Sequence, residues 1–398
     1  MKMAESVTFA ERFNGISGSA IRDIFKLIAQ PNMISFAGGN PSSRALEEDV
    51  ISEFAREVLA KDGKAILQYG ATEGYAPLRE SIADFCKSIL GFSCQESEIL
   101  PISGSTQAMD LLCKTLINPG DTILAENPTF LGNMQCMRLY QANIVPVSTD
   151  NGGVILEDLE EKIKKHHPKM LYIIPTFQNP TGITLAADRR EKIAELAEKY
   201  GVIIAEDDPY RDLRYRGTAL PTIKSYDKAG WVIYLGSFSK LISPGMRVGF
   251  LVSGQPLLRK LTVGKQSADV HTSNLTEAII DAYLRSGKLP AHIKDICSFY
   301  GEQMNAMLSE LSKFPAGTTH TQPDGGLFIW AALPNGINAL DMLKKCIEHH
   351  VAYVPGTHFF VDGGHLNTLR LNFSMSPVDK IHEGMTALRE VLENEIGG

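Results

Sequence analysis

Short apolar runs alternate with helical patterns between about residues 95 and 255, and this alternation limits the fold more than any other feature of the sequence. Four of the runs are rich in β-branched residues and bounded by Gly, Pro or acidic residues, which is typical of buried strands. They cover Thr122–Ala125, Leu171–Ile174, Val202–Ala205 and Val232–Leu235. Residues 187–200, between two of these runs, place Ile193, Ala197 and Tyr200 at helical spacing. Strands separated by helices require crossover connections, so the pattern predicts an α/β fold with a mainly parallel sheet between helices.

The sequence changes after about residue 275, where long amphipathic helical stretches flank short strands. The helices are predicted at about 290–314, 338–349 and 377–395, and the strands at 327–332, 351–354 and 368–372. A chain of 398 residues is also longer than one simple core usually fills. We therefore predict a large domain over residues 45–275 and a smaller α+β domain formed by 276–398 together with 1–44.

The overall charge and the cysteines exclude several classes of protein. A formal net charge of -7 and a pI near 5.8 argue against a general nucleic-acid or membrane-surface binder, because binding to phosphates needs a basic face. No apolar run approaches the roughly 18 residues that span a bilayer, and the N-terminus lacks the apolar core of a secretory signal. The six cysteines show no CxxC and no metal-ligand spacing, so we predict reduced thiols, no metal site and a cytoplasmic protein.

Polar residues follow three of the predicted strands, at the edge of a parallel sheet where ligands usually bind. These tails cover residues 175–182, 206–210 and 236–249. Lys240 lies in the third tail, close to Ser237, Ser239 and Arg247. An isolated lysine is usually a solvated surface residue, but small and hydroxyl neighbours leave room here for a ligand. The positive charge of Arg247 should lower the pKa of Lys240, and a neutral amine is the form that Schiff-base chemistry needs.

Asp207 and Asp208 follow the buried run 202–205. Paired carboxylates at this position could cap a helix, bind a metal or hold a cation. No third carboxylate or histidine lies nearby at metal-ligand spacing, which disfavours a metal. A single buried aspartate is suited to the protonated ring nitrogen of a cofactor.

Two further segments could bind anions. Ser103–Leu112 combines a turn of small residues with the start of a helix, whose free N–H groups attract phosphate, although Ser and Thr are also ordinary helix caps. The segment matches neither the Walker A pattern nor GxGxxG, so nucleotide binding is poorly supported. Arg370 interrupts the apolar strand 368–372, where an inward arginine needs an anionic partner such as a carboxylate. From the pattern alone, an edge arginine that faces water is an equally good interpretation.

Taken together, these segments resemble the class I/II aminotransferases of PLP fold type I, most closely the group that includes the 2-aminoadipate and kynurenine aminotransferases. The resemblance covers most of the chain, from Tyr69–Gly74 (YGATEG) to Arg370. The specific motifs, in the family's order, are NPTG at 179–182, DDPY at 207–210 and SFSKLISPGMRVG at 237–249. The resemblance implies a large domain with a mainly parallel, seven-stranded sheet and a smaller α+β domain.

The resemblance also implies how the ring of pyridoxal 5'-phosphate (PLP) is held. Lys240 would form a Schiff base with PLP and later transfer a proton at the substrate, and Asp207 would pair with the pyridine N1–H. Asn179 and Tyr210 would bind the phenolic oxygen. Phe130 stands where the family commonly has a tyrosine that stacks on the ring, so stacking is kept while the hydroxyl is lost.

The same resemblance assigns the residues for the phosphate and the substrate. The phosphate would be held by Ser105, Thr106, Ser237 and Arg247. Tyr69 would reach the phosphate of the neighbouring subunit, which implies a homodimer. Arg370 would bind the α-carboxylate of the substrate with Asn179 beside it, and Gly39 belongs to an N-terminal loop that covers the substrate.

The implied reaction transfers the amino group of a 2-amino acid to a 2-oxo acid, with 2-oxoglutarate as acceptor, by a ping-pong mechanism. One alternative is a β-lyase, because the same residues could expel a leaving group from Cβ. A PLP-binding sensor without catalysis is disfavoured, because Lys240, Asp207 and Arg370 are all present and no output domain is attached. The preference for a particular side chain depends on the poorly patterned N-terminal segment.

Overall fold

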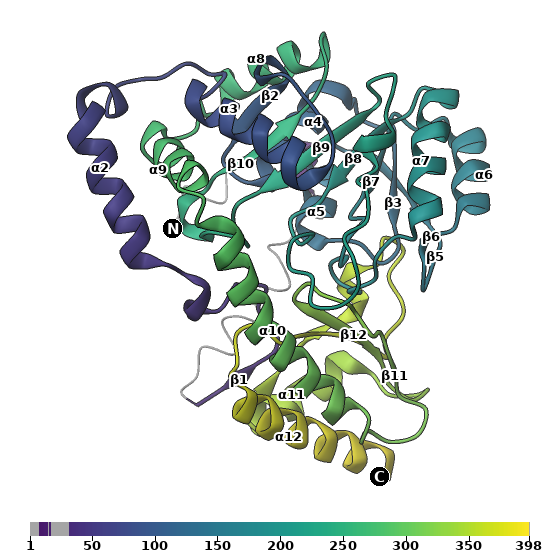
Figure 1. Ribbon diagram of the computed structural model, residues 1–398. Helices are drawn as coiled ribbons and strands as arrows, with labels where there is room; N and C mark the ends of the chain where they lie inside the picture. The colour runs from purple at the N-terminus through teal and green to yellow at the C-terminus, as the bar shows by residue number, and fades with distance from the viewer. Residues whose placement is uncertain (1–7, 15, 17–31, 398) are drawn as a thin grey trace.

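The computed structural model describes residues 8–14, 16 and 32–397. Its centre is a seven-stranded sheet in the order β2-β10-β9-β8-β7-β3-β4 (Figure 1). The strands are β2 (Ile99–Ile102), β3 (Thr122–Glu126), β4 (Asn143–Val147), β7 (Met170–Ile173), β8 (Ile203–Asp207), β9 (Val232–Ser237) and β10 (Gly249–Val252). Neighbouring strands from β9 to β4 run parallel, and β10 is antiparallel to both β9 and β2. The predicted α/β fold with a mainly parallel sheet is therefore confirmed.

Helices cover both faces of this sheet because its strands are apolar on both sides. Leu171 and Ile173 of β7 pack with α6 and α7, whereas Met170 and Tyr172 belong to the core that contains α4 and α5. The helices of this part are α2 (Glu48–Ile66), α3 (Ala76–Phe85), α4 (Ser105–Leu116), α5 (Leu131–Leu139), α6 (Leu156–His166), α7 (Ala187–Tyr200), α8 (Leu257–Asp269) and α9 (Asn274–Arg285). The short strands β5 (Thr149–Asp150) and β6 (Gly153–Val154) pair with each other. The helix α7 has the limits that the apolar spacing predicts.

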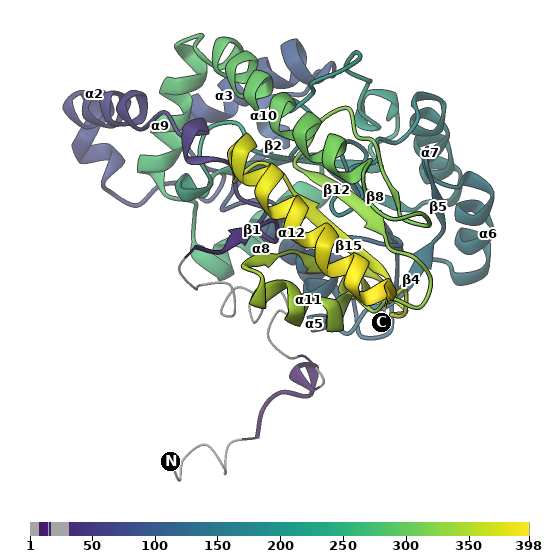
Figure 2. The same cartoon turned by 90° about the horizontal axis from the view of Figure 1, so that it is seen from below.

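The C-terminal part of the chain contains a four-stranded antiparallel sheet in the order β11-β12-β15-β14. Its strands are β11 (Thr319–His320), β12 (Phe328–Ala332), β14 (Val354–Pro355) and β15 (Thr368–Asn372), and its helices are α10 (Leu289–Leu311), α11 (Ala339–Glu348) and α12 (Val378–Gly397). Figure 2 shows α10 and α12 side by side on this part of the molecule. No helix among the described residues combines the length and the apolar character needed to cross a membrane.

The N-terminal segment is joined to this C-terminal part by backbone hydrogen bonds. β1 (Ile34–Ser35) pairs in parallel with β13 (Val351–Ala352). Beyond β1, Phe36 O accepts a hydrogen bond from the backbone N–H of Asn372. The contact places residues 34–36 beside β15, the strand that carries Arg370. The rest of the predicted N-terminal segment, at 1–7, 15 and 17–31, lies outside the described residues.

The single strand predicted at 351–354 is wrong, because the chain changes sheets within it. β13 pairs with β1, whereas β14 pairs with β15. Tyr353 lies between the two strands, and its buried hydroxyl donates to Ala339 O at 2.6 Å. A short apolar run therefore marks burial correctly without showing which sheet each half joins.

Candidate active site

The carboxyl ends of β7, β8 and β9 meet at one edge of the large sheet, because the three strands are adjacent and parallel. Asp207 is the last residue of β8 and Ser237 the last residue of β9, so these side chains belong to the strand ends rather than to the following loops. A cavity of about 240 Å³ opens at this edge. The predicted residues that line it are Ser105, Thr106, Phe130, Asn179, Asp207, Tyr210, Ser237, Lys240 and Arg247.

Lys240 lies in the turn after β9, and its Nζ donates a hydrogen bond of 2.7 Å to Gly39 O. Because Gly39 belongs to the N-terminal segment, this contact brings the predicted covering loop onto the lysine. The pKa of Lys240 is lowered to about 8. Burial is the main cause, followed by the positive charge of Arg370 and then by that of Arg247. Arg247 therefore lowers the pKa as predicted, but it is the smallest of the three causes.

Asp207 is buried at the end of β8. Its Oδ2 accepts hydrogen bonds from the Tyr172 hydroxyl at 2.8 Å and from Asn133 Nδ2 at 3.2 Å. Its Oδ1 is buried and has no hydrogen-bond partner among the described residues. Burial raises the pKa of Asp207 to about 7; the Tyr172 hydrogen bond opposes this rise, and the charge of Asp208 adds to it. A cation placed beside the unpaired oxygen of a buried carboxylate stabilises its charge, so Asp207 is suited to bind a cationic group.

Tyr172 and Asn133, the two residues that donate hydrogen bonds to Asp207, are not predicted from the sequence. Tyr172 stands in the apolar run 171–174, and a buried tyrosine usually needs a partner for its hydroxyl, which is a signal that could have found it. Asn133 lies inside α5 and also donates to the Tyr172 hydroxyl, at 2.8 Å. No pattern in α5 marks Asn133, because its role arises only when α5 packs beside β7 and β8.

Arg370 on β15 is 3% exposed, so the alternative of an edge arginine that faces water is wrong. Its Nη1 donates to Asn179 Oδ1 and its Nη2 to Ala37 O, both at 2.8 Å. The guanidinium lies over the Phe328 ring, 4.3 Å from the ring centroid. Burial lowers the pKa of Arg370 to about 10, so the group keeps its charge at neutral pH. Both hydrogen-bond partners of Arg370 are uncharged, so its positive charge is available to pair with an anionic ligand.

Asn179 and Tyr210 are polar residues of the cavity that interact with Arg370. Asn179 Oδ1 accepts from Arg370, so the amide nitrogen remains as its donor. Burial raises the pKa of Tyr210 to about 12; Arg370 opposes this rise and Asp207 adds to it. The Tyr210 hydroxyl is therefore protonated at neutral pH and can donate a hydrogen bond. Its ring packs edge-on against Phe328, with 5.7 Å between centroids.

The opposite end of the cavity is the turn that precedes α4. Gly104 has a φ of 100°, and a Cβ at this position would collide with the guanidinium of Arg247. Arg247 Nη2 in turn donates to Ser103 O at 2.8 Å. The helix α4 begins at Ser105, so its first free N–H groups and the hydroxyls of Ser105 and Thr106 border the cavity. This combination of N–H groups, hydroxyls and a guanidinium is suited to a phosphate.

Three predicted residues do not line the cavity: Gly39, Arg370 and Tyr69. Gly39 and Arg370 are joined to it by hydrogen bonds to Lys240 and Asn179, which do line it. The Tyr69 side chain is 82% exposed. Its ring lies edge-on to His271 with 6.1 Å between centroids, and the neighbouring Gly70 N–H donates to His271 Nε2 at 3.1 Å. The side chain therefore points away from the site of its own chain.

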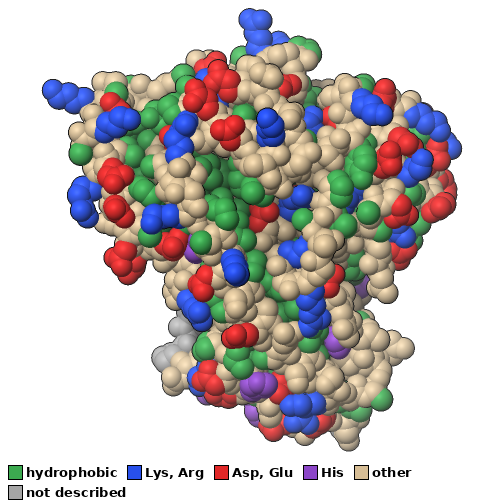
Figure 3. Space-filling view, viewed as in Figure 1, with side chains coloured by type: hydrophobic (Ala, Val, Ile, Leu, Met, Phe, Trp, Pro, Cys, Tyr) green, Lys and Arg blue, Asp and Glu red, His purple; other side chains and the backbone are tan. Residues whose placement is uncertain are grey.

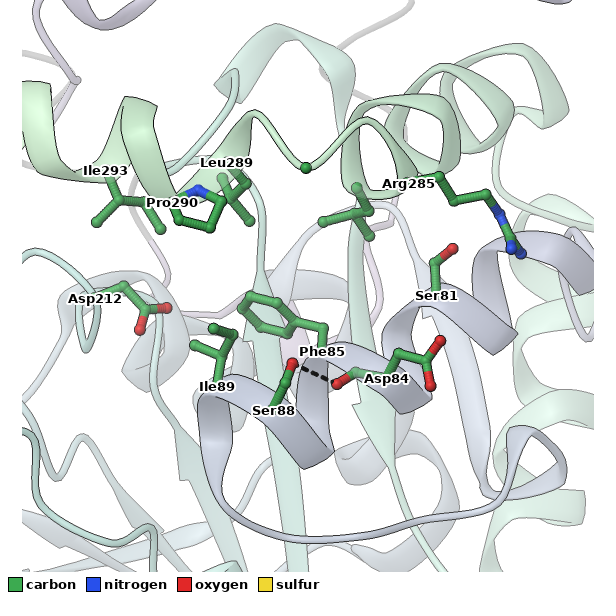
Figure 4. Close-up of a pocket in the computed structure, with 12 residues that line it drawn as sticks. Ser81, Asp84, Phe85, Ser88, Ile89, Asp212, Arg285, Leu289, Pro290 and Ile293 are labelled. Atoms are coloured by element: carbon green, nitrogen blue, oxygen red, sulfur yellow. Dashed lines mark hydrogen bonds between the residues drawn. The ribbon is translucent and has the colours of Figure 1, made fainter.

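A larger cavity of about 440 Å³ lies between α3 and the junction of α9 and α10. Apolar side chains gather in a hollow on this face (Figure 3), and Figure 4 shows Phe85 and Ile293 among those that line it. Two of its polar residues, Ser81 and Arg285, already bind Asp281. None of the predicted site residues that the structure describes borders this cavity. Size alone does not identify the functional cavity of this protein.

Known proteins match the chain over almost its whole length. Residues 31–388 match the family model of the class I and II aminotransferases. The chain belongs to this family. It is 41% identical to the aromatic-amino-acid aminotransferase 1 of Thermococcus litoralis, over 98% of this chain and 94% of that protein. It is 36% identical to the 2-aminoadipate transaminase of Thermus thermophilus, over 98% of this chain and 97% of that protein.

Among solved structures, the kynurenine aminotransferase of Pyrococcus horikoshii, in complex with PMP, KYN and KYA, is 38% identical and covers 99% of each chain with a TM-score of 0.95. The predicted PLP fold type I and the predicted transaminase activity are thus confirmed for this aminotransferase.

Proposed function

We propose that PLP, the cofactor of this family, binds in the cavity of about 240 Å³ at the ends of β8 and β9. Two observations support the fit. The free Oδ1 of Asp207 is a buried acceptor that a protonated pyridine nitrogen would satisfy. The turn at Gly104 has no room for a side chain beside Arg247 and presents the start of α4, which suits the phosphate group.

Each predicted residue that lines the cavity would then bind a particular atom or group of the cofactor. Lys240 would hold the aldehyde carbon covalently, and Asp207 would bind the pyridine nitrogen. Asn179 and Tyr210 would donate to the phenolic oxygen, and Phe130 would stack on the ring. The phosphate would be bound by Ser105, Thr106, Ser237 and Arg247.

When bound, PLP supplies an electron sink that stabilises negative charge at the substrate Cα. Lys240 Nζ would accept the proton from the substrate Cα and would later donate it again to complete the transfer. Its pKa of about 8 leaves a useful fraction of neutral amine near pH 7, as a proton acceptor requires. Asp207 stays charged beside the ring nitrogen, because a cation next to it lowers its raised pKa. The segment at Gly39 lies on Lys240 and helps to exclude water.

We assign the substrate from the position of Arg370 relative to Lys240. Arg370 is bound to Ala37 O, and Lys240 is bound to Gly39 O, two residues further along the same segment. A carboxylate bound to Arg370 would therefore keep its Cα close to Lys240 Nζ. The α-carboxylate is common to 2-amino acids and 2-oxo acids, so one binding mode serves both halves of the reaction.

We further propose that 2-oxoglutarate is the amino acceptor and that several classes of 2-amino acid are donors. Relatives of this chain are named for aromatic amino acids and for 2-aminoadipate. Because 2-aminoadipate is glutamate lengthened by one methylene, a site of that kind has room for a dicarboxylic acid such as 2-oxoglutarate.

A screen of amino donors against 2-oxoglutarate, with glutamate formation as the readout, tests this proposal. We expect glutamate from aromatic and from dicarboxylic donors. Pyruvate in place of 2-oxoglutarate is the matched control for the acceptor. Transfer to pyruvate but never to 2-oxoglutarate would refute the acceptor and leave the transaminase intact, whereas no transfer by yellow, PLP-loaded protein would refute the transaminase activity.

We also propose a homodimer in which Tyr69 contributes to the phosphate site of the neighbouring subunit. The exposed ring of Tyr69, held outward by His271, supports this arrangement. Mixed dimers of Lys240→Ala and Tyr69→Ala chains provide the test. If the two residues act across subunits, each mixed dimer has one intact site, and activity returns on mixing. If mixing two inactive variants restores nothing, Tyr69 does not act across the interface.

The division into a domain of residues 45–275 and a domain of 1–44 with 276–398 remains our proposal, supported by the seven-stranded sheet in the first part, the four-stranded sheet in the second and the course of α10 from one to the other (Figure 1). We propose a cytoplasmic location, which the six free cysteines support because disulfides are rare in the cytosol.

A further inference from the structure

The side chain of Lys265 on α8 is fully buried, at 0% exposure. Lysines are almost never buried to this degree unless they are paired. Lys265 Nζ donates to both carboxylate oxygens of Asp269, at 3.0 and 3.1 Å, and to Gln107 Oε1 at 2.9 Å. Lys265, Asp269 and Gln107, here called the Lys265 cluster, do not line the cavity, and no part of the reaction described above uses them.

The Lys265 cluster surrounds Ser103, the first residue of the turn that leads into α4. Gln107 Oε1 accepts from the Ser103 backbone N–H at 2.8 Å. Asp269 Oδ2 accepts from the Ser103 hydroxyl at 3.2 Å and from Gln107 Nε2 at 2.7 Å. Arg247 binds the remaining group, the Ser103 carbonyl, at 2.8 Å. All the polar groups of Ser103 are therefore held in place.

We propose that Lys265 is a positioning residue for phosphate binding, acting through Asp269 and Gln107 on the turn of residues 103–106. This inference rests on the proposed binding of the PLP phosphate at that turn. The turn contains Gly104 in a left-handed conformation, and glycine restricts its own backbone less than any other residue. External contacts must therefore fix the direction of the N–H groups at the start of α4. Lys265 fixes them because it holds Gln107 Oε1 and Asp269 in the places where both reach Ser103.

The test compares two ligands that differ only in the phosphate. Cofactor-free Lys265→Met protein is titrated with PLP and, separately, with pyridoxal, which has the same aldehyde and ring but no phosphate; binding is followed by absorbance. We expect the Kd for PLP to rise about 10- to 100-fold, by analogy with the outer partners of metal ligands, whose removal typically costs that much in affinity. The Kd for pyridoxal should stay unchanged, because Lys240 and Asp207 are untouched.

Lys224→Met is the matched control. Lys224 is also a largely buried lysine, 14% exposed, and it pairs with Asp227 at 2.8 Å, but it does not line the cavity or contact the turn. Its replacement should change neither Kd. Gln107→Leu is a second variant that cuts the link to Ser103 while it keeps the Lys265–Asp269 pair, and it should weaken PLP binding selectively as well.

The outcomes separate this inference from the proposed function. Equal weakening of PLP and pyridoxal in both Lys265→Met and Gln107→Leu would show a general structural role and overturn the proposal, as would unchanged PLP binding in both. If the unsubstituted protein binds PLP no more tightly than pyridoxal, the phosphate site itself is wrong, and the proposed function fails at that point instead.

Discussion

The two ends of the cavity hold their binding groups in different ways. At the α4 end, Gly104, Ser105 and Thr106 follow one another in a single turn, and the helix supplies the N–H groups. At the β8 end, Asp207 lines the cavity and Arg370 is joined to it through Asn179, and these two charged residues come from strands of two different sheets and are almost fully buried. A local backbone feature forms one end, and long-range packing of charged side chains forms the other.

The difference reflects the energetic cost of burying charge. A charged group removed from water needs hydrogen-bond partners, and Asp207 and Arg370 each have their own: Tyr172 and Asn133 for Asp207, and Asn179 and a backbone carbonyl for Arg370. We infer that the β8 end controls the chemistry and the substrate, whereas the α4 end controls affinity for the cofactor. Substitutions at the two ends should therefore change different measured quantities.

The largest effect is expected for Lys240→Ala, because Lys240 is the reactive amine between the two ends. Turnover should fall by about 10²- to 10⁴-fold or more, the contribution usual for a positioned acid–base group. Borohydride treatment followed by mass spectrometry should find a pyridoxyl group on the peptide of residue 240 in the unsubstituted protein and none there in the variant. An adduct on another lysine of the unsubstituted protein would remove Lys240 from its role.

Asp207→Asn should come next and should act on kcat. Removal of a buried, preorganised charge at the ring nitrogen is expected to lower kcat by about 10²- to 10³-fold. Asp208→Asn is the matched control, since Asp208 is an adjacent buried carboxyl that does not line the cavity. A comparable loss in both variants would mean that the effect comes from folding rather than from the ring nitrogen.

Arg370→Met should raise KM for the amino acid and for the oxo acid together. The loss of charge-assisted hydrogen bonds to the α-carboxylate predicts an increase of about 10- to 100-fold in both, with PLP still bound. Arg214→Met is a matched control, because Arg214 also lies over a phenylalanine ring, that of Phe177, but donates to Arg216 O and not to a residue that lines the cavity. If only one of the two KM values responds, Arg370 does not serve both half-reactions.

The same contrast explains which parts of the site can be predicted from the sequence. Ser105, Thr106, Ser237 and Arg247 stand in short motifs beside a strand or a helix start, so local patterns find them. Tyr172, Asn133 and Lys265 act through contacts with other elements. A tyrosine in an apolar run signals that its hydroxyl needs a partner, and Lys265 has Asp269 four residues along its own helix, but their segments do not show which other elements they contact. Arg370 is an intermediate case: its strand is evident, but its pattern is equally compatible with an edge position. The alternation of strands and helices predicts the main sheet, whereas the division of 351–354 between two sheets depends on pairing that a short run does not encode.

Tyr172→Phe tests whether the partners of a buried charge at the β8 end contribute to its function. The substitution removes the 2.8 Å hydrogen bond to Asp207 Oδ2 but keeps the bond from Asn133. One hydrogen bond to a charged group predicts a fall in kcat of about three- to tenfold, much less than for Asp207→Asn. Tyr234→Phe, at a buried tyrosine of the neighbouring β9, should leave kcat unchanged. An equal fall in the control would assign the effect to packing.

The smallest effect is a shift in the pH dependence of Lys240, and it compares the two ends within one measurement. The pKa of Lys240 is lowered to about 8, mainly by burial, then by Arg370 and least by Arg247. Because only the neutral amine attacks an aldehyde, the initial rate at which cofactor-free protein captures PLP should rise from pH 6 to pH 9 with a midpoint near 8. Removing a neighbouring positive charge raises the pKa of an ammonium group, so both Arg370→Met and Arg247→Met should move the midpoint to higher pH. The shift should be larger for Arg370→Met, since the β8 end exerts the stronger influence on the amine. A larger shift for Arg247→Met would reverse the roles of the two ends, because the group that binds phosphate would then also set the reactivity of the lysine.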